Sequence, residues 1–124
     1  MKKTLGTLLA TALLAVLSFS AKAQTKVPDD INALLSKHTC LACHNADTRL
    51  VGPAYKDVAK KKYTNQQIVD LIYNPKPEHW PGYPPMAPMK QVPKEDALKI
   101  AGWINSLAGG PAKAPAKKPA AKKS

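Results

Sequence analysis

Apolar residues between positions 28 and 107 recur mainly with the spacing of an α-helix. The first run follows an i, i+3, i+4, i+7 pattern, which is typical of an amphipathic helix, at Ile31, Leu34, Leu35 and His38. A proline followed by two aspartates, at positions 28–30, favours a helix start, because the N-terminal end of a helix tolerates proline and attracts negative charge. We expect this helix to run into Cys40.

Three further helices are predicted after residue 54. A short helix is expected around residues 55–62, and a longer one begins with a capping box formed by Thr64 and Gln67 and continues to about Tyr73. The last helix is expected over residues 94–107, with an apolar stripe made of Ala97, Ile100, Ala101, Ile104 and Leu107. No segment shows a convincing strand pattern, so the predicted fold class is all-α, with four to five short helices.

Prolines interrupt this pattern between Asn74 and Pro93. They exclude a regular helix or a central strand there, and they stand at positions 75, 77, 81, 84, 85, 88 and 93. Large apolar side chains argue against disorder, at Trp80, Tyr83, Met86 and Met89. A long ordered loop in a small domain is usually functional.

The first 23 residues have the features of a cleaved signal peptide. Lys2 and Lys3 precede an apolar run over residues 8–19, and Ala21-Lys22-Ala23 fits the small-x-small cleavage rule. The alternative is a membrane anchor, but the run is shorter than the ~20 apolar residues that a spanning helix needs. We predict that residues 1–23 are removed and that the mature chain is exported to the periplasm.

Residues 108–124 form a tail without any large apolar side chain. Such a composition predicts a disordered, basic segment after a folded domain at residues 24–107. The net charge of the chain is +11. Three lysines lie before residue 24 and five after residue 107, so about +3 remains for the folded domain. A basic tail favours acidic proteins or anionic membrane lipids as partners. The alternative is a tail that only increases solubility and has no partner. Nucleic acid is not expected as a partner, because an exported protein encounters little of it.

The only two cysteines of the chain belong to the sequence Cys40-Leu41-Ala42-Cys43-His44. Cys-x-x-Cys-His is the attachment pattern of a c-type haem. Two thiols at this spacing lie about one helical turn apart and can reach the two vinyl groups on one edge of a porphyrin. The adjacent imidazole then falls beneath the iron. The motif therefore predicts one covalently bound haem c, with its iron, and His44 as an iron ligand.

Three other uses of these cysteines fit the sequence less well. A thioredoxin-like pair requires a βαβ setting, which the pattern lacks. A closed zinc site requires four ligands, and the other two histidines, His38 and His79, lack the usual paired spacing. A disulfide across so short a stretch would add little stability.

The segments that surround the motif resemble the small monohaem class I cytochromes c of the bacterial c-551/c-552 type. The resemblance covers roughly residues 31–107. It rests on VGPAYKDVAKK from Val51, on Trp80 ahead of a proline-flanked methionine, and on KEDALKIAGWINSL from Lys94. It implies the small cytochrome c fold, built around a covalently attached haem, and a role as an electron carrier.

The family implies His44 as the proximal iron ligand and a methionine sulfur as the second axial ligand. Met86 is the better candidate, because Pro85 precedes it and Val92 follows six positions later. Met89 is the second choice, and its alternative roles are packing against the haem edge or an exposed thioether. The sequence here is Met-Ala-Pro where the family often has Met-Pro-Pro, and an asparagine that commonly follows is absent.

The resemblance also implies three residues of the haem environment. The carbonyl of Pro53 is expected to accept a hydrogen bond from Nδ1 of His44, and Gly52 to permit the close approach of that segment. The indole N–H of Trp80 is expected to approach a haem propionate. Simple packing is the alternative role for Trp80.

Iron with a histidine and a methionine ligand has no open position for a substrate, which suits one-electron transfer. We therefore expect a monomer that is not an enzyme, binds no small-molecule substrate and passes electrons between redox proteins of a respiratory chain. Lysines could steer the encounter, at Lys37, Lys56, Lys60, Lys61, Lys62 and Lys90. One alternative is a five-coordinate or bis-histidine haem with a peroxidase-like or sensing role, in which His79 acts on the distal side. Another is a binding module that acts through its basic tail.

Overall fold

The structure is a computed structural model that describes residues 22–109; the predictions for residues 1–21 and 110–124 lie outside it. The elements are α1 (Asp29–Lys37), the 3-10 turn η1 (Cys40–Ala42), α2 (Tyr55–Lys60), α3 (Asn65–Tyr73), the 3-10 turn η2 (Pro77–His79) and α4 (Lys94–Ser106). Residues 22–109 contain no strand. The predicted all-α class is therefore confirmed.

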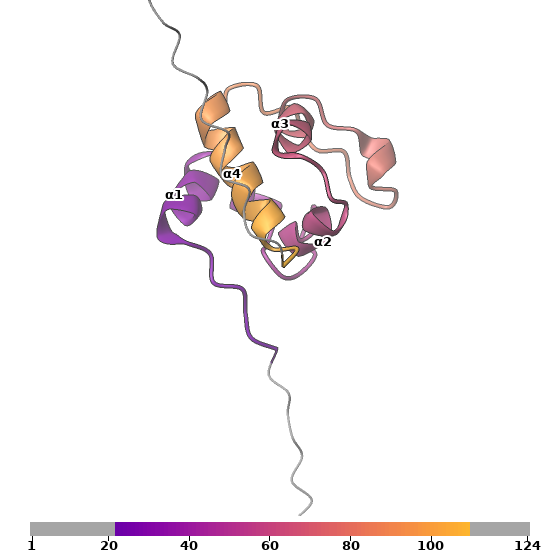
Figure 1. The fold of residues 1–124 in the computed structure, drawn as a ribbon. Coiled ribbons are helices and arrows are strands. Elements are labelled where there is room, and N and C mark those ends of the chain that lie inside the picture. Colours follow the sequence, from indigo (N-terminus) through magenta and orange to yellow (C-terminus); the bar gives the residue numbers. More distant parts are fainter. Residues whose placement is uncertain (1–21, 110–124) are drawn as a thin grey trace, which may run out of the picture.

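Helix α4 lies in the middle of the fold and contacts α1, α2 and α3 (Figure 1). Its buried side chains are those of Ala97, Ile100, Ala101, Trp103 and Ile104. They pack with Leu35 of α1 and Val69 of α3, which are both fully buried. Removal of such side chains from water is the main favourable contribution to folding. The predicted stripe of α4 is thus buried, except that Leu107 follows the helix and stays half-exposed.

Helix α1 ends earlier than its hydrophobic pattern predicts. It begins at Asp29 after Pro28, as expected, but its last residue is Lys37. Thr39 then adopts a left-handed conformation with φ of 57°, which an α-helix cannot contain. The expectation that this helix runs into Cys40 is therefore wrong, and the cysteine motif begins on a separate 3-10 turn.

The capping box at the start of α3 is confirmed. The Thr64 hydroxyl accepts a hydrogen bond from the Gln67 backbone N–H at 3.1 Å, and the Gln67 side chain accepts one from the Thr64 N–H at 2.8 Å. Two N–H groups that would otherwise lack partners at the helix start are satisfied in this way.

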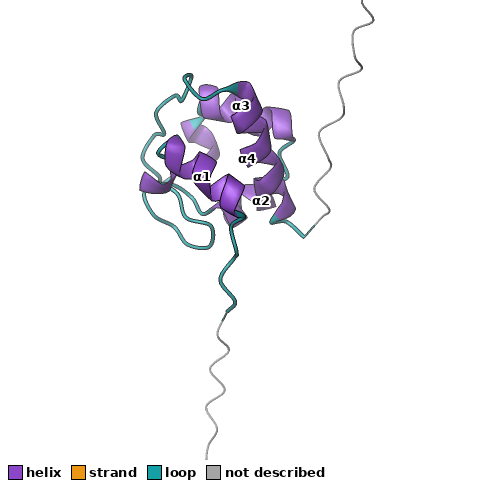
Figure 2. Cartoon of the chain, turned by 90° about the vertical axis from the view of Figure 1, so that its left-hand side faces the viewer, coloured by secondary structure: helices purple, strands orange, loops and turns teal. Residues whose placement is uncertain are grey.

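The segment from residue 74 to residue 93 contains one short 3-10 turn and otherwise irregular structure. Its later part is attached to α3, because the Met89 N–H donates to the carbonyl of Ile72 at 2.9 Å and the Tyr73 hydroxyl donates to the carbonyl of Val92 at 2.8 Å. Loops of this kind, drawn in teal in Figure 2, form much of the periphery around the helices.

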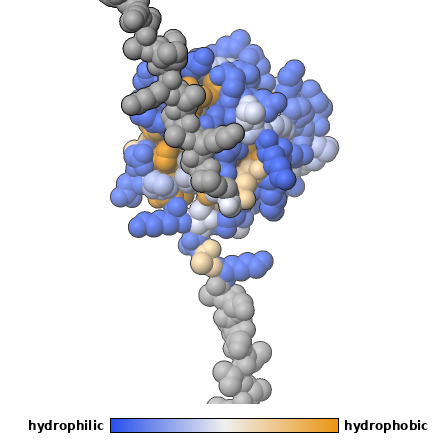
Figure 3. Space-filling model, in the orientation of Figure 1, coloured by the Kyte–Doolittle hydropathy of each residue, from blue (hydrophilic) through white to orange (hydrophobic). Residues whose placement is uncertain are grey.

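Hydrophilic side chains predominate on the face that Figure 3 shows, and apolar ones are visible only in small areas. None of the helices between residues 22 and 109 combines the length and the apolar character that crossing a membrane requires.

Candidate haem-binding site

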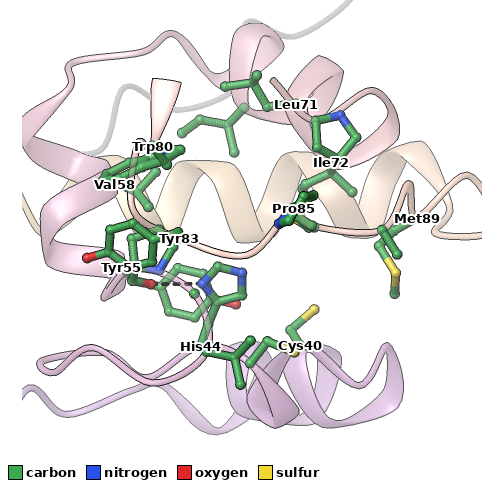
Figure 4. A pocket seen from close by; sticks show the side chains of 18 of the residues that line it. Cys40, His44, Tyr55, Val58, Leu71, Ile72, Trp80, Tyr83, Pro85 and Met89 are labelled. Atoms are coloured by element: carbon green, nitrogen blue, oxygen red, sulfur yellow. Dashed lines mark hydrogen bonds between the residues drawn. The ribbon is translucent and has the colours of Figure 1, made fainter. Parts of the chain in front are cut away.

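A largely apolar cavity of about 480 Å³ separates the cysteine motif from the proline-rich loop and α3. In Figure 4, His44 and Cys40 lie below it and Leu71, Ile72 and Trp80 above, with Pro85 and Met89 between. The volume lies within the range of roughly 300–1,000 Å³ that is usual for cofactor sites. The cavity brings together every site residue that the sequence predicts: Cys40, Cys43, His44, Pro53, Trp80, Met86 and Met89.

The 3-10 turn η1 sets the spacing of the two thiols. The N–H groups of Cys43 and His44 both donate to the carbonyl of Cys40, at 3.2 and 3.0 Å, so the three side chains project from one tight turn. Both cysteines are free; Cys40 is half-buried and Cys43 is exposed. Burial raises the pKa of the Cys40 thiol, which keeps it protonated at neutral pH. Both sulfur atoms are available for thioether bonds at the cavity.

His44 is held in the tautomer that a metal ligand needs. Its Nδ1 lies 2.8 Å from the carbonyl oxygen of Pro53. A carbonyl can only accept, so Nδ1 carries the proton and Nε2 keeps a free lone pair. Burial lowers the pKa of the imidazole, and the Pro53 contact opposes this shift. A neutral ring with one nitrogen fixed and the other free is the form that binds a metal.

Gly52 allows the Pro53 segment to lie directly against the His44 ring. Its N–H donates to the carbonyl of Cys43 at 2.7 Å. A Cβ atom at this position would lie 2.5 Å from Cε1 and 2.9 Å from Nδ1 of His44, well inside contact distance. The absence of a side chain at residue 52 is therefore a condition for the Pro53–His44 hydrogen bond.

Tyr55 is a residue of the site for which the sequence predicts no role. It opens α2 and is buried, and its ring stacks on the His44 imidazole with centroids 5.1 Å apart and planes inclined by 22°. The Tyr55 and Trp103 rings also pack edge to face, with centroids 5.2 Å apart. The stack supports the imidazole plane from α2 and α4. Its position two residues after Pro53 was the only sequence signal for it.

Met86 and Met89 both line the cavity, but they are held differently. The Met89 backbone is bonded to Ile72, and its sulfur accepts a hydrogen bond from the Gln91 amide at 3.7 Å. Met86 is 39% exposed and makes no hydrogen bond within residues 22–109. Of the two thioethers, that of Met86 is the one without a hydrogen bond in this part of the chain.

The other histidines do not line the cavity. His38 is buried and its Nε2 lies 2.9 Å from the Asp96 carboxylate, which links α1 to α4. Nδ1 of His79 lies 2.9 Å from the Tyr63 hydroxyl, and the two rings stack. His44 is thus the one histidine of the described residues that faces the cavity. No three His, Cys, Asp or Glu side chains between residues 22 and 109 form a metal-binding group.

Trp80 contacts the edge of the Tyr83 ring, and two cations cover this aromatic pair. Lys61 Nζ lies 4.8 Å from the Trp80 ring, and the Arg49 guanidinium lies 3.9 Å from the Tyr83 ring. The two cation–ring contacts could not be predicted from the sequence, because their partners lie far apart in the chain and nothing in the local pattern marks them.

The sequence and the structure both match a group of small bacterial haem proteins. The chain is 35% identical over 108 residues to cytochrome c-552 of Nitrosomonas europaea, which covers 83% of this chain and 94% of that protein. It is 37% identical over 101 residues to cytochrome c-551 of Pseudomonas aeruginosa, and this match covers 77% of this chain and 94% of that protein. The chain belongs to the c-551/c-552 family of small class I monohaem cytochromes c. No protein-family model matches the chain.

The crystal structure of the Nitrosomonas europaea cytochrome c552 matches this cytochrome with a TM-score of 0.57 at 35% identity, over 61% of this chain and 98% of that one. The fold is therefore the small cytochrome c fold. Cytochromes of this family are electron carriers with one covalently bound haem c and its iron. The cavity fits that group in volume, in apolar lining, and in its two free thiols beside a neutral imidazole.

Half of the lysines predicted to steer partners of this cytochrome are paired with its own carboxylates. Lys37 pairs with Asp96, Lys56 with Asp47, and Lys60 with Asp57. Lys62 and Lys90 are exposed and form no ion pair within residues 22–109. Surface pairs of this kind contribute little stability, but they neutralise charge that a partner would otherwise meet.

Asp47 connects the start of the domain to the loop behind His44, and we expect it to make stability acid-sensitive. Hydrogen bonds from Lys56 and then from Thr25 lower its pKa to about 2, below the ~3.9 of an unfolded aspartate. Its contribution is complete above the unfolded value and is lost as the pH falls through the folded value. Thermal midpoints measured from pH 5 to pH 2 should fall less steeply in Asp47→Asn than in the wild type. Glu78→Gln, at an exposed carboxyl, is the control. Equal slopes for Asp47→Asn and the wild type would contradict the assignment.

Proposed function

We propose that this protein is a periplasmic electron carrier whose haem is attached through Cys40 and Cys43 and ligated by His44 and Met86. Electrons would pass between redox proteins of a respiratory chain. Removal of residues 1–23 and export of the mature chain belong to the same proposal. The basic tail at residues 108–124 would favour acidic partners or anionic lipids.

The observation that carries the proposal is the state of His44. Its ring is half-buried at the cavity, neutral, supported by Tyr55, and bonded through Nδ1 to Pro53 at 2.8 Å. Only Nε2 remains free for a metal. An imidazole held in this way gives an iron ligand of fixed plane, which keeps the coordination geometry similar in both oxidation states.

The hydrogen bonds of the two methionines favour Met86 as the second iron ligand, in agreement with the sequence pattern. Among residues 22–109 the sulfur of Met86 has no hydrogen-bond partner. The sulfur of Met89 already accepts a hydrogen bond from the Gln91 amide, and the Met89 backbone is bonded to α3. Met89 would then pack at the cavity wall. A thioether ligand favours the reduced metal and raises the reduction potential.

The bound haem supplies one-electron exchange at its iron. The residues around the motif decide where a partner can approach. Large apolar side chains are exposed within the cysteine motif, at Leu41, and in the segment that leads to Pro53, at Leu50 and Val51. An exposed apolar area of this kind favours protein contact. The predicted contact is small and transient, as is usual for electron-transfer partners.

Trp80 lines the cavity beside Lys76, and we propose that its indole N–H approaches a haem propionate there. The bis-histidine alternative loses support, because His79 is bonded to Tyr63 and lies outside the cavity lining.

A spectroelectrochemical titration of the haem-loaded wild type tests the proposal. We expect one reversible one-electron transition, and in the oxidised protein the weak long-wavelength absorption band of a methionine-ligated ferric haem. A high-spin, water-ligated oxidised spectrum without that band would contradict the proposal and favour a five-coordinate site.

A further inference from the structure

The methionine loop, defined here as residues 84–92, is attached to the rest of the protein mainly at its ends. Its C-terminal end is bonded to α3 through Met89 and Val92. Residues 84–88 take part in no hydrogen bond within the described chain, and three of these five residues are prolines, which lack the N–H. The position of Met86 therefore depends on how the loop is held where it begins.

Arg49 holds the two residues that directly precede the methionine loop, Gly82 and Tyr83. The guanidinium donates a hydrogen bond to the carbonyl of Gly82 at 2.7 Å, and its carbon lies 3.9 Å from the centre of the Tyr83 ring. Arg49 belongs to the segment between His44 and Pro53, which carries the proximal side of the site. One side chain thus joins the two sides of the cavity across 33 residues of sequence.

The residues between this contact and Met86 transmit it. Gly82 has a φ of 83°, a conformation that glycine adopts without strain and that exposes its carbonyl to Arg49. Pro84 and Pro85 follow Tyr83, and each proline restricts φ to about −65°. The backbone between Tyr83 and Met86 therefore has little conformational freedom, and the position of Tyr83 largely determines that of Met86.

We propose that Arg49 is a positioning residue for the axial methionine. Its contact with Gly82 and Tyr83 keeps the methionine loop closed, so that the sulfur of Met86 stays in the cavity. The inference rests on the proposed ligation by Met86. Lys61 and Tyr63 contact the preceding turn, at His79 and Trp80. These contacts are more distant in sequence from Met86 than the contacts of Arg49 are.

Imidazole binding to the oxidised, haem-loaded protein tests this role. Added imidazole binds only when Met86 has left the iron, so its apparent dissociation constant reports the fraction of molecules with an open loop. Arg49→Gln should bind imidazole about tenfold more tightly than the wild type, because it loses both a charged hydrogen bond and a cation–aromatic contact. The imidazole affinity of Arg49→Lys should lie between those of the wild type and Arg49→Gln, because lysine keeps the charge but lacks the planar guanidinium group. Lys99→Gln removes the same charge from an exposed position on α4 and should bind like the wild type.

The same titration on a Met86→Ala background separates this role from a general loosening of the fold. There the sulfur no longer competes, so adding Arg49→Gln should change the affinity less than about twofold. Equal affinities of Arg49→Gln and the wild type would overturn the role of Arg49, as would an equal change in both backgrounds. Equal affinities of Met86→Ala and the wild type would instead show that Met86 is not the ligand.

Discussion

Replacing Gly52 with alanine should lower the free energy of unfolding of the haem-loaded protein by about 2–4 kcal/mol. The new methyl group would lie 2.5 Å from Cε1 of His44, so the ring or the backbone must move. Either movement breaks the Nδ1 hydrogen bond to Pro53, which now measures 2.8 Å. Denaturant unfolding gives the stability, and the shifts of the His44 ring protons in the oxidised protein report the rotation of the imidazole.

Gly102→Ala is the matched control. A Cβ at Gly102 would meet Asn65 Nδ2 at 3.7 Å, an ordinary contact, and the position lies inside α4. Alanine is favoured over glycine in a helix interior by roughly 0.5–1 kcal/mol, so this variant should be as stable as the wild type or more so. A Gly52→Ala protein with wild-type stability and unshifted His44 signals would refute the close approach on which the proximal site depends.

Replacing Met86 with alanine should lower the reduction potential on the order of 0.1 V or more, within the ~0.8 V range that axial ligands span. The change removes a ligand that favours the reduced iron and opens a position to water, which stabilises the more highly charged oxidised centre. Potentiometric titration of the haem-loaded variant measures the shift.

Met89→Ala is the control for that prediction, because it removes a thioether from the same cavity wall. We expect a potential close to that of the wild type, with some loss of stability from the packing of Met89 against the core. A large fall in Met89→Ala together with an unchanged Met86→Ala protein would reverse the proposed ligand assignment.

Sequence patterns predicted the parts of this fold that depend on local chemistry. The capping box of Thr64 and Gln67 involves residues three positions apart, and the buried stripe of α4 follows helical periodicity. The cysteine motif is likewise a local pattern, since one 3-10 turn holds both thiols and the imidazole. The end of α1 was not predictable in this way, because the left-handed Thr39 leaves no mark in the pattern of apolar residues.

Contacts between distant segments were beyond the sequence. The stacking of Tyr55 on His44 and the hydrogen bond from Arg49 to Gly82 depend on how separate loops meet across the cavity. The sequence favours Met86 over Met89 through its flanking residues, but it does not show the contacts of the two side chains. Within residues 22–109, Met89 is bonded to α3 and to Gln91, and Met86 is bonded to neither. The neutralisation of Lys37 by Asp96 and of Lys56 by Asp47 is also a tertiary feature, whereas Lys60 pairs with Asp57 three positions earlier in the same helix.

X-ray absorption at the iron edge of the oxidised protein would show whether Met86 binds the iron, because it detects sulfur bound to iron independently of stability and reduction potential. We expect one sulfur ligand in the wild type and in Met89→Ala, and none in Met86→Ala. An iron without sulfur in the wild type, or a sulfur ligand lost from Met89→Ala and retained in Met86→Ala, would contradict the ligation by Met86.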